Sequence, residues 1–225
     1  DLTGQEYEKA FQYIYRLILD GTAKPGDKLP TERAIAETLG ISRNSTREAL
    51  SIFLAMGMIE RRQGSGNYVA GNFGPALKQM IYMMLAINTT SQRDICAFRK
   101  HMEKAACAAI YEMEKPEDWC AGLEQILNTP AETIEDEIER DRAFHYGLIC
   151  ETKNTFWITI MDAVVEVYRE WIDRCLRRVS EALRQELGAV HREILEDLKN
   201  GDMKRCNAAI EKHYGIIDTA MEVEA

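Results

Sequence analysis

The stretch that decides the fold lies at residues 25–50 and reads PGDKLPTERAIAETLGISRNSTREAL. It opens with turn residues, and a segment with helical spacing of apolar side chains follows, which Thr31 can cap at its start. That helix ends at Gly40, because glycine readily adopts the left-handed conformation that follows a helix. A second helix begins after Ser42 and runs to about residue 56. Two short helices joined by a few residues that include glycine predict a helix-turn-helix.

The second of these helices has an inward face and a basic outward face. Four side chains at helical spacing are expected to pack inward: Thr46, Ala49, Leu50 and Phe53. Arg43 and Arg47, four residues apart, project together from the outward face near the start of the helix. A recognition helix places that end in the major groove of DNA, where arginine contacts guanine edges or phosphates.

The residues after this helix predict a β-hairpin. The segment MIERRQGSGNYVA has strand patterns at 58–62 and 66–70 around the turn Gly64-Ser65-Gly66. A hairpin directly after a helix-turn-helix is a wing, and glycines at its tip let the backbone approach a duplex closely. The alternative is that the arginines form an ordinary solvated face and that the hairpin only covers the domain. The order of turn, helix, turn, helix and hairpin favours DNA binding.

Charge divides unevenly along the chain, whose net charge is −9. Residues 1–72 hold nine basic and nine acidic groups, whereas residues 73–225 hold nineteen basic and twenty-eight acidic groups. The segment AGNFGPA at 70–76 is typical of a joint between domains. We therefore predict two domains, 1–72 and 73–225. A local basic patch on the neutral first domain can contact phosphate although the whole chain is acidic.

The second domain is helical in pattern throughout, and strand signals are absent. Breaks at turn residues, among them Lys115-Pro116, separate the expected helices. These helices run at about 75–88, 91–113, 116–128, 131–152, 154–178, 181–200 and 202–222. The predicted fold is mainly α: an N-terminal winged helix-turn-helix followed by a C-terminal all-α helical bundle, whose interior can host a ligand site.

Histidine is scarce, so the placement of the four histidines is informative. Asp141 and His145 are four residues apart on one expected helix, while His191 and His213 lie on the last two. One carboxylate and three imidazoles match a site for zinc, with nickel and manganese as alternatives. The alternative for each histidine alone is a hydrogen-bonded core or surface residue.

Cysteine use and hydropathy predict a cytoplasmic protein without a membrane partner. The six cysteines are scattered singly with no Cys-x-x-Cys pair, as expected for buried, reduced thiols. The longest apolar run, MIYMMLAI at 80–87, is too short to span a bilayer. No basic and then apolar segment of the signal-peptide kind opens the sequence.

The N-terminal segments PGDKLPTERAIAETLGISRNSTREAL and GMIERRQGSGNYV resemble the winged helix-turn-helix of GntR-type bacterial transcription regulators. The resemblance covers nearly all of residues 7–70 and implies binding to double-stranded operator DNA. Thr46 stands where the family usually has an aliphatic residue. The DNA contacts that the resemblance implies are Arg33, Arg43, Asn44, Ser45, Arg47, Gly64 and Ser65.

The C-terminal segments DRAFHYGLICETKN, AVHREILEDLKNGD and AAIEKHYGII resemble the FCD-type sensor domain of one GntR subfamily. Many members bind a divalent metal through one aspartate and three histidines, and the matching positions here are Asp141, His145, His191 and His213. His101 falls outside this pattern and is expected to be exposed.

The same resemblance implies two effector-binding residues. Arg99, in DICAFRKHMEKAACAAI, matches an arginine that often meets a carboxylate effector, although Ala97 replaces the usual acidic residue two positions before it. The alternative for Arg99 is an ion pair with Glu103. Asn154 matches a position that can line the ligand pocket, and its alternative is a helix N-cap.

We therefore expect a dimeric, ligand-responsive regulator that binds pseudo-palindromic DNA and senses a small organic acid through a bound metal. A metal-dependent enzyme on a helical bundle is the alternative from another class. The Asp-x-x-x-His helix lacks a glutamate placed as general base, and no His-Glu-x-x-His motif occurs, so we predict that the protein is not an enzyme. A third alternative keeps the regulator but makes the metal purely structural, or the signal itself.

Overall fold

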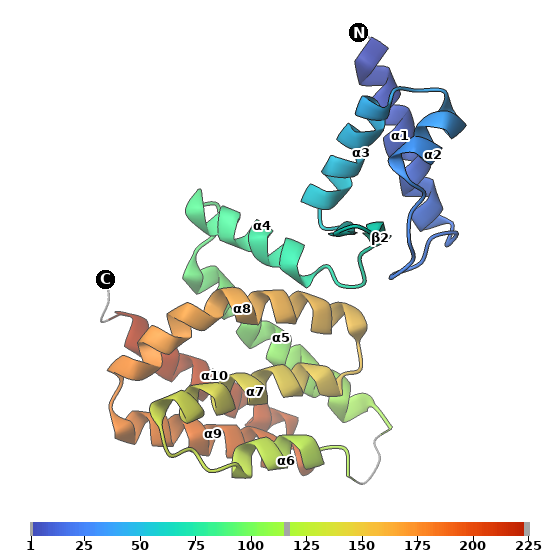
Figure 1. Cartoon of the computed structure of the whole chain (residues 1–225). Coiled ribbons are helices and arrows are strands. Elements are labelled where there is room, and N and C mark those ends of the chain that lie inside the picture. The colour runs from blue at the N-terminus through green and yellow to red at the C-terminus, as the bar shows by residue number, and fades with distance from the viewer. Residues whose placement is uncertain (1, 115–117, 223–225) are drawn as a thin grey trace. The chain divides into compact units, whose positions relative to one another are not determined.

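The computed structural model describes residues 2–114 and 118–222. The chain divides into two compact units, Asp1–Leu77 and Lys78–Ala225. The division lies within helix α4, Gly74–Ala86, rather than at the predicted joint after residue 72. In Figure 1 the N-terminal unit is blue to cyan, and the bundle runs from green to red. The predicted fold class, a winged helix-turn-helix followed by an all-α bundle, is confirmed. Among the described residues, no helix is both long enough and apolar enough to cross a membrane.

The N-terminal unit packs three helices and a hairpin around one apolar core. Its elements are α1 (Leu2–Leu19), α2 (Glu32–Leu39), α3 (Arg43–Ala55), β1 (Ile59–Arg62) and β2 (Gly66–Val69). The core is built from side chains of all three helices and both strands, among them Ile14, Ile35, Leu50, Phe53, Ile59 and Val69. The four α3 side chains predicted to face inward are all fully buried.

Local caps set the bounds of the two central helices. The Thr31 hydroxyl accepts a hydrogen bond from the amide of Ala34 at 3.2 Å and caps α2. Gly40 ends α2 with φ of 63°, in the left-handed region that favours glycine. Ser42 caps α3 by accepting from the Ser45 amide at 3.0 Å. The helix bounds predicted from these cap residues are confirmed.

The hairpin is antiparallel, with Ile59 opposite Val69 and Arg62 opposite Gly66. Each strand is one residue shorter at its outer end than predicted. Gly64 at the tip has φ of 69°, which a residue with a side chain rarely adopts. Arg62 stacks over the ring of Tyr68, with 4.0 Å between the guanidinium carbon and the ring centroid.

The C-terminal unit is a bundle around one large apolar core and a second, smaller apolar cluster. Its described residues form the later part of α4 and six further helices: α5 (Gln92–Glu112), α6 (Ala121–Asn128), α7 (Ile134–Glu151), α8 (Thr155–Arg178), α9 (Glu181–Lys199) and α10 (Met203–Glu222). Helices α9 and α10 pack along each other, and α5 packs against α7, α8 and α10. Figure 1 shows α5, α7, α8, α9 and α10 layered together in this unit. This arrangement brings the middle parts of α5, α7, α9 and α10 to a common interior.

Helix α6 differs most from its predicted range of 116–128. It begins only at Ala121, because the chain first makes a turn in which the Ala121 amide donates to the Asp118 carbonyl at 3.0 Å. The predicted break at Lys115-Pro116 lies outside the described residues. All six cysteines are thiols rather than disulfides, and all are buried except Cys150, which is half-buried.

Candidate functional site

A basic groove lies between the helix-turn-helix and the wing. Its volume is about 450 Å³, and the predicted wing-tip residues Gly64 and Ser65 line it. One acidic side chain, Glu32, also lines it. The basic side chains along the groove are Lys28, Arg33, Arg43, Arg61 and Arg62. Lys28, Arg61 and Arg62 were not predicted from the sequence, although the adjacent arginines in the run ERR of the first strand were a usable signal.

The predicted arginines of the helices are exposed and available to phosphate. Arg33 pairs with Glu37 at 2.7 Å, and Arg47 pairs with Glu32 at 3.3 Å. Such exposed pairs contribute little, about 0–1 kcal/mol, so a phosphate group can displace the carboxylate. Arg43 forms no ion pair within the part of the chain that the structure describes.

Ser45 differs from the expectation that it contacts DNA. It is buried, and its hydroxyl donates to the Glu6 carboxylate at 3.0 Å. The Ser42 amide donates to the same carboxylate oxygen at 3.1 Å and, with the Ser45 hydroxyl, lowers the pKa of Glu6. Glu6 on α1 thus braces the start of the recognition helix. The neighbouring Asn44 is exposed, as a DNA contact requires, while the Thr46 hydroxyl is satisfied inside by donating to the Ser42 carbonyl at 3.2 Å.

All four predicted metal ligands converge in the interior of the bundle. Asp141 and His145 come from α7, His191 from α9 and His213 from α10, and each is buried. Each residue offers one ligand atom, and these atoms lie within 4.8 Å of one another. The sequence could place only the first pair on one helix face; the fold brings the other two to it.

The spacing of these atoms fits a single ion. Nε2 of His191 lies 3.4 Å from Oδ1 of Asp141 and 3.2 Å from Nε2 of His145, and the latter nitrogen lies 3.5 Å from the same Oδ1. Ligand atoms about 2.0–2.2 Å from a tetrahedral zinc ion lie roughly 3.4 Å apart. The donor set of nitrogen and oxygen atoms suits zinc and other transition metals.

The three imidazoles of the cluster differ in their pKa values because their electrostatic surroundings differ. Burial disfavours the charged form of His145, but Glu103 and Asp141 more than offset it and raise the pKa of His145 to about 9. Burial and the neighbouring His145 lower the pKa of His191 to about 3, and the same two causes hold the pKa of His213 well below its usual value. Burial opposes ionisation of Asp141, but the surrounding imidazoles lower its pKa. Neutral imidazoles and an ionised carboxylate are the forms that bind metals.

Glu103 on α5 stands behind His145, on the side away from the other ligands. Its Oε1 lies 2.9 Å from Nδ1 of His145. This distance fits an ion pair, although the ring N–H does not point directly at the oxygen as a hydrogen bond requires. The same oxygen accepts a hydrogen bond from the Tyr214 hydroxyl at 2.6 Å. A carboxylate at one ring nitrogen fixes the orientation and the tautomer of a metal-binding histidine. No sequence periodicity connects Glu103 with His145, so only the fold reveals this contact.

Arg99 is buried, whereas a residue that contacts a ligand entering from solvent would be accessible. It is only 4% exposed, and its Nη2 lies 3.9 Å from Oε1 of Glu103. Its guanidinium carbon lies 4.4 Å from the centroid of the Tyr168 ring. The structure thus shows the ion pair with Glu103 that was the alternative to effector binding.

The other predicted effector residue, Asn154, is exposed at the start of α8. Its Oδ1 accepts from the amides of Phe156 at 3.1 Å and Trp157 at 3.2 Å. The structure therefore gives Asn154 the alternative role of helix N-cap. His101 is exposed as predicted, and its Nδ1 lies 2.6 Å from the Ala97 carbonyl.

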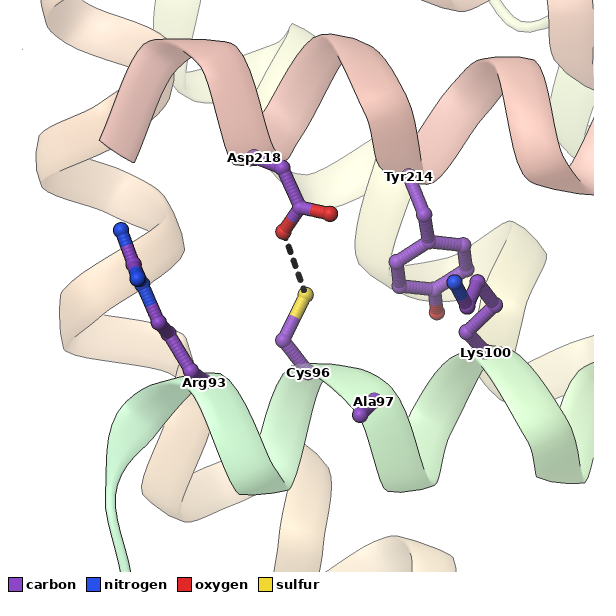
Figure 2. Close-up of a pocket in the computed structure, with 6 residues that line it drawn as sticks. All are labelled: Arg93, Cys96, Ala97, Lys100, Tyr214 and Asp218. Atoms are coloured by element: carbon purple, nitrogen blue, oxygen red, sulfur yellow. Dashed lines mark hydrogen bonds between the residues drawn. The ribbon is translucent and has the colours of Figure 1, made fainter. Parts of the chain in front are cut away.

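Two hollows lie near the metal-binding residues, and one of them is lined by two of these residues. A narrow cleft of about 20 Å³ between α7 and α9 reaches Asp141 and His191. A larger cavity of about 230 Å³ lies between α5 and α10, and Tyr214 forms part of its wall (Figure 2).

Comparisons with known proteins cover both units. The sequence matches the family described as bacterial regulatory proteins, gntR family, over residues 6–69 and the FCD domain over residues 94–215. The HTH-type transcriptional regulator LutR of Bacillus subtilis (strain 168) is 28% identical, over 91% of this chain and 96% of that protein. The Uxu operon regulator of Haemophilus influenzae is 26% identical, over 72% of this chain and 60% of that protein.

A solved structure supports the fold. The structure titled Streptococcus agalactiae GntR aligns with a TM-score of 0.68 at 20% identity, over 94% of this chain and 98% of that chain. The domains and the named relatives are those of transcription regulators and not of enzymes. The chain belongs to the GntR family of bacterial transcription regulators, in the group that carries a C-terminal FCD domain.

Proposed function

We propose that this regulator binds a pseudo-palindromic operator as a homodimer and senses a small organic acid in its FCD domain with the help of a bound divalent metal. The observation that carries the proposal is the convergence of Asp141, His145, His191 and His213 in a chain that also carries a winged helix-turn-helix. We place its action in the cytoplasm, where the operator DNA is accessible.

The basic groove is the proposed DNA-binding surface. Arg43, Asn44 and Arg47 would contact the major groove from α3, and Arg33 would contact the backbone from α2. The wing tip at Gly64-Ser65 would approach the adjacent phosphates. Two such domains in a dimer read half-sites about 34–36 Å apart, so a change in their separation alters the fit to the operator.

An exposed apolar face supports the homodimer. One side of α4 packs on the core of the C-terminal unit through Ile81, Tyr82 and Leu85. The side chains at helical spacing on its other side are 42–63% exposed, and they are Met80, Met83 and Met84 together with Ile87 just after the end of the helix. A contiguous apolar patch of this kind marks a surface that another protein covers. In a two-fold dimer the same patch can meet its own copy.

The metal would be held by the carboxylate of Asp141 and the ring nitrogens of the three histidines. Zinc is the ion that this donor set suits first, with nickel or manganese as alternatives. When bound, the ion supplies a concentrated positive charge that can attract a carboxylate. Glu103 would keep Nε2 of His145 directed at the ion, and all four ligands are buried.

Selection of host genomic fragments by the metal-loaded protein at physiological salt tests this function. Enrichment of a pseudo-palindrome is the expected result, and a panel of small carboxylates added in parallel should change the enrichment. Absence of any enriched sequence, both with and without the acids, would contradict DNA-binding regulation. If chelation melts the FCD domain while no acid changes DNA binding, the metal is structural.

A further inference from the structure

A cavity of about 230 Å³ lies between α5 and α10, apart from the four metal-binding side chains. Figure 2 shows Arg93 toward one end, Lys100 and Tyr214 toward the other, and Cys96 facing Asp218 between them. The cavity is smaller than the roughly 300–1,000 Å³ of sites for drug-sized ligands, so it suits only a small ligand.

The cavity is locally basic, although the residues after 72 carry all of the net negative charge. Glu211 pairs with both Lys100, at 3.2 Å, and Lys104, so one carboxylate is shared by two ammonium groups. Arg93 is exposed and forms no ion pair among the described residues. Asp218 is the one acidic side chain in the lining. These five groups together leave one net positive charge.

The wall of the cavity leads directly to the metal-binding residues. The Tyr214 ring faces the cavity, while its hydroxyl donates to Oε1 of Glu103 at 2.6 Å. That oxygen lies 2.9 Å from Nδ1 of His145, and His213 precedes Tyr214 in the chain. An occupant that packs on Tyr214 therefore restrains a residue in contact with the metal-binding cluster.

We propose that this cavity binds a short dicarboxylate that carries a hydroxyl group, at a site distinct from the metal coordination sphere. The proposal rests on the proposed sensing function of the FCD domain. Arg93 and Lys100 are seven residues apart on α5, about 10.5 Å along the helix axis, so each can bind one end of a four- or five-carbon dicarboxylate. Asp218, which lies between them in Figure 2, accepts a hydrogen bond from the Cys96 thiol at 4.0 Å, and its carboxylate can accept another from a hydroxyl group of the ligand.

Occupancy of this cavity is coupled to metal binding through Tyr214 and Glu103. Because linkage is reciprocal, an acid that binds more tightly to the metal-loaded domain also raises the affinity for the metal. The domain can thus respond to acid binding in the cavity as well as to metal binding, and both act on the same four residues.

Calorimetric titration of the metal-loaded full chain with L-malate tests the proposal, with succinate as the matched acid that lacks the hydroxyl group. Arg93→Ala should weaken malate binding about tenfold or more, because it removes a charge-assisted contact. Arg174→Ala, an exposed arginine of α8 outside the cavity, is the control and should leave the affinity unchanged. Asp218→Ala should abolish the preference for malate over succinate.

Three results would overturn the proposal. One is a malate affinity that is the same in the Arg93→Ala variant and the unmodified chain. Another is binding that survives Arg93→Ala but disappears in a folded Asp141→Asn variant, which would place the acid at the metal and leave the sensing function intact. The third is no malate binding at millimolar concentration. Failure of the regulator function itself would appear separately, as the absence of an enriched operator.

Discussion

Replacing Glu103 with glutamine tests whether the carboxylate behind His145 orients that metal ligand. The substitution keeps the size of the side chain and one acceptor oxygen but removes the negative charge. Both Glu103 and His145 have side chains only 1% exposed, and 2.9 Å separates Oε1 from Nδ1. Water therefore cannot replace the lost contact.

The expected loss in metal affinity is about 10–100-fold, the usual cost of removing the partner of a metal-binding histidine. That range corresponds to about 1.4–2.8 kcal/mol. Glutamine also leaves Arg99 without its counter-ion, and breaking a buried pair destabilises a protein by about 3–5 kcal/mol. The 3.9 Å separation of this pair and the contact of Arg99 with Tyr168 place the expected destabilisation at the lower end.

Competition with a chromophoric chelator measures zinc affinity, and the visible spectrum of the cobalt-substituted protein reports the ligand geometry. We expect the variant to bind both ions more weakly and to show a shifted cobalt spectrum, which a loss of stability alone would not produce. Glu196→Gln, an exposed glutamate on α9, is the matched control. A folded Glu103→Gln protein with unchanged affinity and an unchanged spectrum would refute the orienting role.

Three further predictions concern the DNA-binding helix and the metal. Arg43→Ala should lower operator affinity and reduce the slope of log affinity against log salt concentration by about one, because one phosphate contact is lost. Titrations at several salt concentrations measure both quantities, and an unchanged slope would contradict the assignment. Ser45→Ala should lower the free energy of unfolding by about 1 kcal/mol, because the buried Ser45 hydroxyl donates to Glu6. Urea titration measures this loss. Weaker DNA binding at unchanged stability would instead make Ser45 a DNA contact. Chelation should lower the melting temperature of the FCD domain, and zinc restored at one hundred times its Kd should return about 2.7 kcal/mol; a calorimetric midpoint that does not respond would contradict metal binding.

The N-terminal unit could be predicted almost completely because its signals are local. Thr31, Gly40 and Ser42 set helix ends through hydrogen bonds and backbone angles that involve only near neighbours. The burial of Ser45 could not be predicted in this way. It depends on Glu6, which lies 39 residues earlier and reaches the start of α3 only after α1 has packed on that helix.

In the bundle, the four predicted metal ligands show the same limit: local sequence signals do not reveal contacts between distant helices. Spacing placed Asp141 and His145 on one helix face, but their meeting with His191 and His213 depends on the packing of three helices. The family resemblance supplied that information, and the structure agrees with it. The resemblance was less informative for Arg99, because its side chain points into the bundle and packs beside Glu103.

Charge balance explains why Arg99 lies inside the bundle. Asp141 and Glu103 place two carboxylates in one buried region, and burying an ionised group costs several kcal/mol unless opposite charge lies close by. Arg99 supplies one positive charge beside Glu103, and the imidazoles supply none once a metal displaces the proton of His145. A divalent ion held by Asp141 and the histidines would then leave the region with one net positive charge. An organic anion is a ligand that can neutralise such a charge, so under the proposed function the metal, Arg99 and an acid in the neighbouring cavity would act as one electrostatic unit.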